Sequence, residues 1–217
     1  MWNQLIKKKH TNELFKYNSR VHVEHPAAIS VFQSNLDLFI TKLYDHASQL
    51  IILCIGTDRS TGDSLGPLVG HKLKVMDCMT NIPIFGTLDE PVHAVNLEET
   101  IKTINDCYPK SFIIAVDACL GKTESVGYIS IKEGPLQPGT GVNKTLPAIG
   151  DLHIVGIVNV GGFMEYMVLQ NTRLSLVMRM AETISEGIAK DISKFHHLQL
   201  SKFEIEPNSL CLETTSQ

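Results

Sequence analysis

Paired cysteine motifs are missing from this sequence of 217 residues, and the spacing of its cysteines is irregular. The five cysteines are Cys54, Cys78, Cys107, Cys119 and Cys211, and none belongs to a CxxC pair. Cys54 lies in an apolar run, where a reduced thiol packs as a small hydrophobic group. An odd, scattered set of this kind is typical of a cytosolic protein.

Strong net charge and long hydrophobic runs are also missing. The net charge is -4 and the pI is about 6.1, which argues against a surface for nucleic acid. The first residues, MWNQLIKKK, have charges after only a few apolar positions and lack the continuous apolar stretch of a signal peptide or membrane span. We therefore expect no nucleic-acid partner, no membrane association and a cytoplasmic location.

What is present is an ordinary supply of hydrophobic residues. They make up 43% of the chain, which is enough for a sizeable core. Residues 1–27 are polar, show no sustained period and are expected to form an N-terminal extension. Residues 28–196 are expected to form a single domain, and residues 197–217 a flexible C-terminal tail.

Short apolar runs alternate with amphipathic stripes along this domain. Apolar spacings of three and four predict helices over residues 26–43, 64–79, 96–108 and 174–196, and Asn96 opens the third in a pattern like a capping box. Apolar or alternating runs predict strands over residues 49–56, 82–88, 111–116, 126–133 and 153–160. This order favours an α/β fold, a three-layer α/β/α sandwich with a mostly parallel sheet.

Two aspartates follow strand-like runs. Asp63 lies in IILCIGTDRSTGDSLGP and Asp117 in SFIIAVDACLG, each expected in a loop just after its strand. The carboxyl ends of parallel strands share one edge of a sheet, where ligands bind, so the two carboxylates can converge. Close carboxylates cannot both ionise cheaply, so one holds a proton as an acid while the other activates water, a pairing suited to amide hydrolysis. The structural alternative is that Asp63 caps a helix and Asp117 bonds to nearby backbone.

Further residues near the pair have candidate roles. Asp58 shares the loop of Asp63 and is interpreted either as a substrate contact or as a solvated turn residue. A cation held by Asp58, Asp63 and Asp117 is a further alternative, because carboxylates are competent metal ligands. Cys119 offers a thiol mechanism as a minor option. We interpret His71, His93 and His153 as structural.

The segment Pro138 to Thr145 is rich in glycine but fails the phosphate-loop pattern, because Pro138 and Asn143 occupy both required glycine positions. Gly139, Thr140 and Gly141 still permit close backbone approach or exposed N–H groups that hold a carbonyl or an anion. A simple structural turn is the alternative. We predict these three residues as substrate contacts.

The segments Gly56 to Pro67 (GTDRSTGDSLGP), Val116 to Ala118 and Pro138 to Lys144 together resemble the YyaC family of sporulation proteins (DUF1256). The resemblance spans most of residues 28–195. That family is similar to the germination protease of spore-forming bacteria, an aspartic endopeptidase that degrades small acid-soluble spore proteins. A wider relative is the hydrogenase maturation endopeptidase, which has the same α/β/α fold.

This resemblance implies a phosphorylase/hydrolase-like domain in which Asp63 and Asp117 match the two catalytic aspartates of the germination protease. Asp58 stands where that protease has Asn, and the glycine-rich loop is one residue shorter, so the substrate groove differs. The maturation endopeptidase grips substrate-bound nickel with Glu, Asp and His. We interpret that set as incomplete in this sequence and expect no metal and no cofactor.

The expected function is therefore amide hydrolysis by an aspartate dyad in a sporulating cell or spore core, with a peptide or small spore protein as substrate. The alternative is a non-catalytic spore protein that binds a peptide or partner in the same crevice, because fold alone does not settle function. The protease relative assembles as a homo-oligomer, and a homo-oligomer is an open option for this chain.

Overall fold

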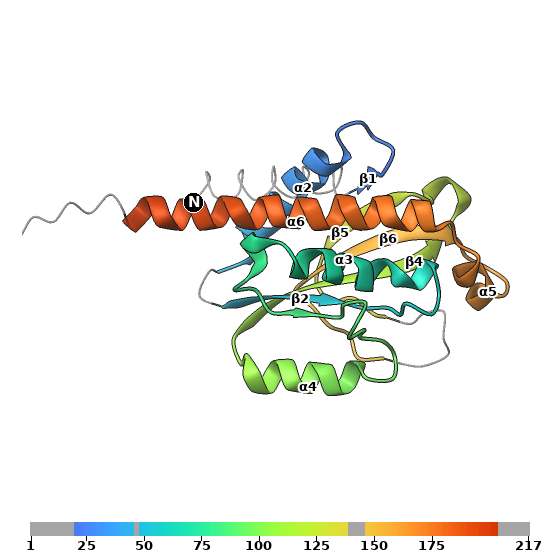
Figure 1. Ribbon diagram of the computed structural model, residues 1–217, viewed down its shortest axis with the longest axis horizontal. Coiled ribbons are helices and arrows are strands. Elements are labelled where there is room, and N and C mark those ends of the chain that lie inside the picture. Colours follow the sequence, from blue (N-terminus) through green and yellow to red (C-terminus); the bar gives the residue numbers. More distant parts are fainter. Residues whose placement is uncertain (1–19, 46–47, 139–145, 204–217) are drawn as a thin grey trace, which may run out of the picture.

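The computed structural model describes residues 20–45, 48–138 and 146–203 (Figure 1). A six-stranded sheet with the order β1-β5-β6-β4-β2-β3 forms its centre. The four strands from β6 to β3 are parallel, whereas β5 and β1 extend the sheet in antiparallel pairings. The strands are β1 (Arg20–His22), β2 (Gln49–Cys54), β3 (Ile84–Phe85), β4 (Ser111–Gly121), β5 (Tyr128–Glu133) and β6 (Leu152–Val160).

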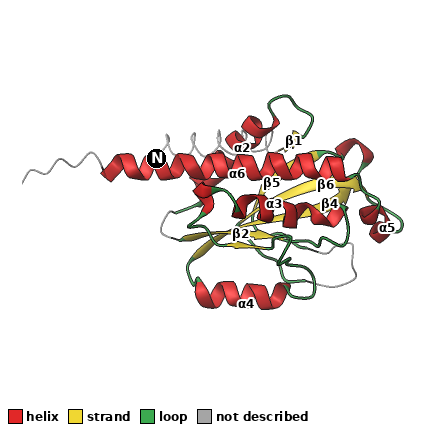
Figure 2. Cartoon of the chain, in the orientation of Figure 1, coloured by secondary structure: helices red, strands yellow, loops and turns green. Residues whose placement is uncertain are grey.

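Helices cover both faces of the sheet, which makes three layers (Figures 1 and 2). Three helices, α2 (Ala28–Leu43), α3 (Leu65–Lys74) and α6 (Leu174–Phe203), lie over one face, and α4 (Leu97–Cys107) lies over the other. The short α5 (Glu165–Gln170) follows β6 at one end of the sheet. The predicted α/β/α sandwich with a mostly parallel sheet is confirmed. Within the described residues, no helix combines the length and apolar character needed to cross a membrane.

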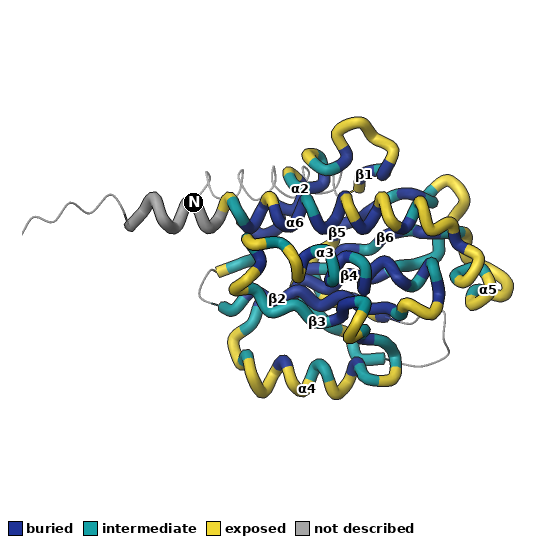
Figure 3. The backbone as a smooth tube through the Cα atoms, in the orientation of Figure 1, coloured by how far each residue is buried: buried dark blue, intermediate teal, exposed yellow. Residues whose placement is uncertain are grey.

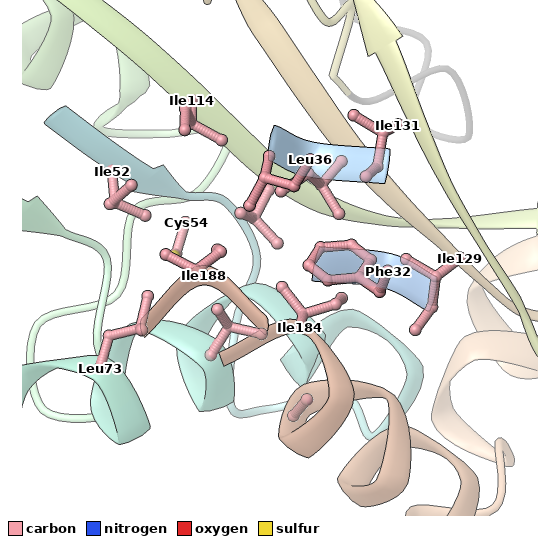
Figure 4. Packing of buried hydrophobic residues seen from close by; sticks show 14 of the residues in the cluster. Phe32, Leu36, Ile52, Cys54, Leu73, Ile114, Ile129, Ile131, Ile184 and Ile188 are labelled. Carbon is pink, nitrogen blue, oxygen red and sulfur yellow. The ribbon is translucent and has the colours of Figure 1, made fainter. Parts of the chain in front are cut away.

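The central strands send alternate side chains into two separate cores, as the pleat of a strand requires. On β2, Ile52 and Cys54 face the three-helix side, while Ile51 and Leu53 face α4. The larger core packs Phe32 of α2 against both the sheet and α6 (Figure 4). Burial on both faces makes the middle of the sheet the most enclosed part of the molecule (Figure 3), and it explains the continuous apolar runs of these strands.

Two boundaries of the domain differ from those expected. Residues 20–22, assigned to the N-terminal extension of residues 1–27, form β1 and pair with β5, and Val21 is buried. Three residues are too few for a strand period to emerge from the sequence. At the other end, α6 continues to Phe203 instead of ending at 196. Residues 197–203, HLQLSKF, contain no Gly or Pro that would stop a helix.

Two elements are shorter than predicted. The helix expected over residues 64–79 ends at Lys74, and a separate 3-10 turn, η2, covers Asp77–Met79. The strand expected over residues 82–88 shrinks to Ile84–Phe85. Gly86 follows with φ +85, in close contact with the backbone of Cys54. That backbone turn carries the chain away from β2 after only two residues.

One acidic side chain of α6 is buried without a partner. Asp191 is 0% exposed, and in the described part of the chain neither of its carboxylate oxygens has a hydrogen-bond partner. Burial, and then the charge of Asp37 on α2, raise the pKa of Asp191 to about 7, although Lys194 opposes the shift. The ordinary value is 3.8, so this residue favours folding most at low pH, and the advantage is lost as the pH rises to about 7.

Asp191→Asn is therefore expected to raise the melting temperature at pH 8 and to leave it nearly unchanged at pH 4. The neutral amide avoids the cost of a buried, unpaired charge, and each kcal/mol shifts the midpoint of a domain of this size by about 2–4 °C. Differential scanning calorimetry between pH 4 and pH 8 measures the effect. Asp106→Asn, at an exposed position of α4, is the control. A gain of equal size at both pH values would contradict this explanation.

Candidate active site

The segment that carries Asp63 closes on itself after β2. Gly56 has φ +144, and a Cβ atom there would lie 2.0 Å from the carbonyl oxygen of Asp63. The amide of Thr57 donates a hydrogen bond to that oxygen at 3.1 Å. Only glycine tolerates both the backbone angle and the close approach. This contact holds Asp63 within a 3-10 turn, η1 (Gly62–Ser64), at the entrance to α3.

A second glycine presses the start of α3 against the end of β2. A Cβ atom on Gly66 would lie 2.1 Å from the carbonyl oxygen of Ile55. No side-chain cap is present at the start of η1 or of α3. The structural alternative for Asp63, a helix cap, is therefore wrong.

Asp117 lies inside β4 and not in a loop after it, which corrects the expectation from the sequence. It pairs with Val155 of β6, and the strand continues to Gly121. The side chain is only 8% exposed, and its Oδ1 atom accepts a hydrogen bond from the amide of Ala118 at 2.8 Å. By strand alternation it shares the α4 side of the sheet with Ala115.

Asp63 lies near enough to Asp117 for its charge to act on the Asp117 carboxyl. Burial raises the pKa of Asp117 well above its ordinary range, and the negative charge of Asp63 raises it further, while the Ala118 amide opposes both. Burial also raises the pKa of the half-buried Asp63 carboxyl, but the nearby His93 lowers it. The two carboxyls therefore differ: Asp117 holds its proton more strongly than Asp63 does.

His93 was interpreted from the sequence as a structural residue, yet its charge acts on Asp63 and lowers the pKa of that carboxyl. It directly follows Val92, which pairs with Ile55 and accepts a hydrogen bond from the amide of Gly56 at 2.8 Å. A single bridge of this kind leaves no alternating pattern in the sequence. The sequence signal that could have identified His93 is its position after β3, because the connection from β3 to α4 starts at the carboxyl end of a parallel strand.

The residues predicted to contact substrate are less well defined by the structure. Asp58 is exposed, and its carboxylate accepts a long hydrogen bond from the Thr57 hydroxyl at 3.4 Å. This position is on the rim of the site, in the same loop as Asp63. Gly139, Thr140 and Gly141 lie outside the described residues, so their role stays a prediction.

Two alternative chemistries gain no support from the geometry. Burial, and then the charge of Asp117, raise the pKa of the Cys119 thiol to about 11, so the thiolate needed for nucleophilic attack is scarce at neutral pH. Across residues 20–45, 48–138 and 146–203, no cluster of three or more His, Cys, Asp or Glu side chains forms a metal site. The trio of Asp58, Asp63 and Asp117 is thus not assembled as a set of ligands.

An apolar groove lies beside the turn that carries Asp63. It has a volume of about 550 Å³ and runs between the end of β6 and α5. Phe163 is 88% exposed and Tyr166 66% exposed, which is unusual for such large side chains. Leu169 and Thr172, next to the groove residues in the chain, pack against Gly62. A Cβ atom on Gly62 would lie 2.8 Å from the Leu169 side chain. The groove residues are Asn159, Val160, Gly161, Phe163, Met164, Met167, Val168 and Asn171.

Comparison with known proteins places this fold in a family. The pattern of the family described as "Protein of unknown function (DUF1256)" matches residues 20–187. The chain is also 53% identical over 178 residues to the "Uncharacterized protein YyaC" of Bacillus subtilis (strain 168), covering 81% of this chain and 86% of that protein. The chain belongs to the DUF1256 family. The predicted membership is confirmed, and the DUF1256 match begins at the first residue of β1.

The DUF1256 chain also shares its fold with a solved protease. The crystal structure of a [NiFe] hydrogenase maturation protease, HycI from Thermococcus kodakarensis KOD1, matches with a TM-score of 0.51 and 18% identity, over 71% of this chain and 99% of that one. A likeness at this identity concerns the fold alone. The predicted kinship with maturation endopeptidases holds at that level, and the similarity to the germination protease stays a prediction.

Gly66→Ala is expected to destabilise the domain, because the added methyl group would overlap a backbone oxygen that cannot move aside. Overpacking of this kind costs about 1–3 kcal/mol. Urea unfolding monitored by circular dichroism measures the loss. Gly161→Ala is the control, because Gly161, like Gly66, has no positive φ, and a Cβ atom there would lie 3.3 Å from its nearest neighbour outside the adjacent residues, the Cβ atom of Leu120. If both substitutions cost the same, the close contact at Gly66 is not a constraint on the fold.

Proposed function

We propose that this chain is a peptidase-like hydrolase of sporulating cells, which cleaves an amide bond in a peptide or small spore protein through Asp63 and Asp117. The observation that carries the proposal is the difference in environment, and so in pKa, between the carboxyls of Asp63 and Asp117. Asp117 is buried in a strand, where burial raises its pKa well above the ordinary range, whereas Asp63 lies at a half-buried turn, where burial raises its pKa and the charge of His93 opposes the rise. Pairs whose environments separate their pKa values are those that divide acid and base roles.

Each aspartate has one role in the proposed reaction. The Asp63 carboxylate accepts a proton from water while the water oxygen attacks the carbonyl carbon of the scissile amide. Asp117 donates its proton to the amide nitrogen, and the C–N bond breaks. Afterwards Asp63 holds the proton and Asp117 is ionised, so a proton returns to Asp117 before the next cycle. General acid–base catalysis of this type contributes about 10²- to 10⁴-fold in rate.

Removal of either carboxyl is expected to slow cleavage strongly without unfolding the chain. Asp63→Asn and Asp117→Asn keep the size of the side chain but cannot exchange the proton, so we expect a loss of about 10²-fold or more. Small acid-soluble spore proteins are incubated with each purified variant, and mass spectrometry measures the new fragments over time. Asp106→Asn, which lies on exposed α4, controls for general effects of the substitution.

Two outcomes of this experiment would contradict the proposed catalytic role of the aspartates. If both Asn variants cut the spore protein at the wild-type rate, the dyad is not the catalyst. If the wild-type chain binds the spore protein and produces no fragments, the protein is a binder that keeps the fold of a hydrolase.

The exposed apolar groove favours this second candidate function, the binding of a polypeptide. Large exposed apolar patches on soluble proteins mark sites of interaction, and methionine-rich surfaces adapt to varied partners. Met164 and Met167 lie in the groove, and Met164 adopts the left-handed conformation with φ 56. For a residue other than glycine this conformation is strained, and strain of this kind clusters at functional sites. Both candidate functions place an apolar segment of the polypeptide in this groove.

Phe163→Asp and Met167→Asp are expected to weaken this association by about tenfold or more. Burial of one large apolar side chain contributes roughly 1.5–3 kcal/mol, and 1.4 kcal/mol corresponds to a factor of ten. Fluorescence anisotropy with a labelled small acid-soluble spore protein measures Kd, in an Asp117→Asn background that prevents cleavage. Val75→Asp, at an exposed apolar position after α3, is the matched control. An equal loss in all three variants would show that the groove is not the binding surface.

A further inference from the structure

The sheet face opposite α2, α3 and α6 is only partly covered. Leu97 and Ile104 of α4 pack against side chains of β2 and β4 on that face. On β6, which lies beyond β4 in the sheet, burial alternates along the strand. Ile154 is buried in the three-helix core, whereas Val155 and Ile157 point to the α4 side and are only half-buried. We call this side of β6, β5 and β1 the open face.

The strand register places Asp117 at the inner end of the open face. Asp117 pairs with Val155 of β6, and Val155 pairs with Ser130 of β5. Ser130 in turn pairs with Arg20 of β1. Residues directly opposite on neighbouring strands point to the same face, and strands lie about 4.8 Å apart, so the Arg20 backbone is about 14 Å from that of Asp117. One row of side chains therefore connects the dyad to the edge of the sheet.

The outer end of the open face carries two cations. Arg20 lies over the ring of Tyr128, with Cζ 4.6 Å from the ring centroid. Lys132 follows Ser130 by two positions on β5, so it points to the same face. Both charges reach across the open face towards β4: burial raises the pKa of the Cys119 thiol, and the charges of Lys132 and Arg20 oppose the rise. The open face is therefore electropositive at its outer end.

Neither cation is neutralised by an acidic side chain of the described residues. In that part of the chain, no ion pair includes either of them. The described acidic residues nearest to them in sequence, Glu24 and Glu133, pair instead with Arg179 and Lys42. The whole chain has a net charge of -4, so this positive area is a local exception. Its charge is complementary to an anionic group of a ligand.

We propose that the open face binds an extended segment of the peptide substrate, and that Arg20 and Lys132 bind a carboxylate of this peptide while the scissile amide lies at Asp117. A guanidinium group matches a carboxylate in geometry and charge, and the half-buried Val155 offers an apolar contact between the two ends. An extended chain advances about 3.3 Å per residue, so about 14 Å places the carboxylate about four residues from the cleaved bond. The inference rests on the proposed function for the reaction at Asp117, but the recognition of a carboxylate does not.

The test uses two libraries of short random peptides, one with amidated and one with free C-termini, passed over the immobilised Asp117→Asn chain, which suppresses cleavage. Mass spectrometry measures the enrichment of Asp and Glu over Asn and Gln among retained peptides, and the preference for free over amidated ends. We expect a preference for the carboxylate of about threefold or more, because each exposed ion pair contributes a factor of roughly 1.5 to 5. Arg20→Gln combined with Lys132→Gln should remove it, whereas Arg20→Lys combined with Lys132→Arg, which keeps both charges, should retain it.

Lys102→Gln combined with Lys110→Gln is the control, because it removes the same charge from exposed positions on α4 and just before β4. Enrichment of Asp and Glu supports the proposal with a side-chain carboxylate, and a preference confined to free ends supports it with the terminal carboxylate. The proposal is overturned if neither preference is found, if the preference survives the loss of both cations, or if the control loses it equally. If the wild type cleaves nothing but shows the cation-dependent preference, the hydrolase proposal fails and the open face remains a peptide-binding surface.

Discussion

The constraint on which the site depends is the burial of a carboxyl group within a parallel strand. Asp117 pairs with Val155 of the neighbouring strand β6, and its carboxyl accepts a hydrogen bond from the backbone amide of Ala118. An isolated charge at such a position is costly, so the group either neutralises or finds a partner. Its neutral form is an acid that keeps a proton available at a pH where ordinary aspartates have lost theirs. That property follows from its place in β4, before any consideration of family.

A buried acid can take part in acid–base chemistry only if a second, more easily ionised group lies next to it. Close backbone packing brings Asp63 towards Asp117. Gly56 and Gly66 let the turn that carries Asp63 and the start of α3 press against the end of β2, at separations that no larger residue permits. Asp63 remains half-buried, where its charge raises the pKa of Asp117 and the charge of His93 lowers its own pKa. The tight packing and the position of the Asp63 carboxyl are therefore consequences of the same contacts.

The layers of the fold could be predicted from the sequence, and Asp63 and Asp117 were selected as a candidate pair for a related reason. Strands buried on both faces are continuous apolar runs, and the carboxyl ends of neighbouring parallel strands meet at one edge. The prediction failed where pairing is brief or local periodicity is absent. β1 has three residues, and His93 enters the site through the single bridge of Val92 to Ile55. The extension of β4 past Asp117 depends on β6, with an irregularity between Cys119 and Leu120, and that partner lies far along the chain.

Asn96 shows why a prediction from a local motif failed: it was predicted to cap α4, and it makes no such cap. Its spacing to Glu99 fits a capping box, yet its side chain bonds to the backbone of Pro91 and His93, on the other side of the helix start. A capping box satisfies the free amides of a helix, whereas this arrangement orders the segment that brings the imidazole to the sheet. The same segment is tied to the sheet, because the amide of Gly56 donates a hydrogen bond to the carbonyl oxygen of Val92 at 2.8 Å. Local sequence can offer a side chain several partners, and the sheet edge determines which of them serves the site.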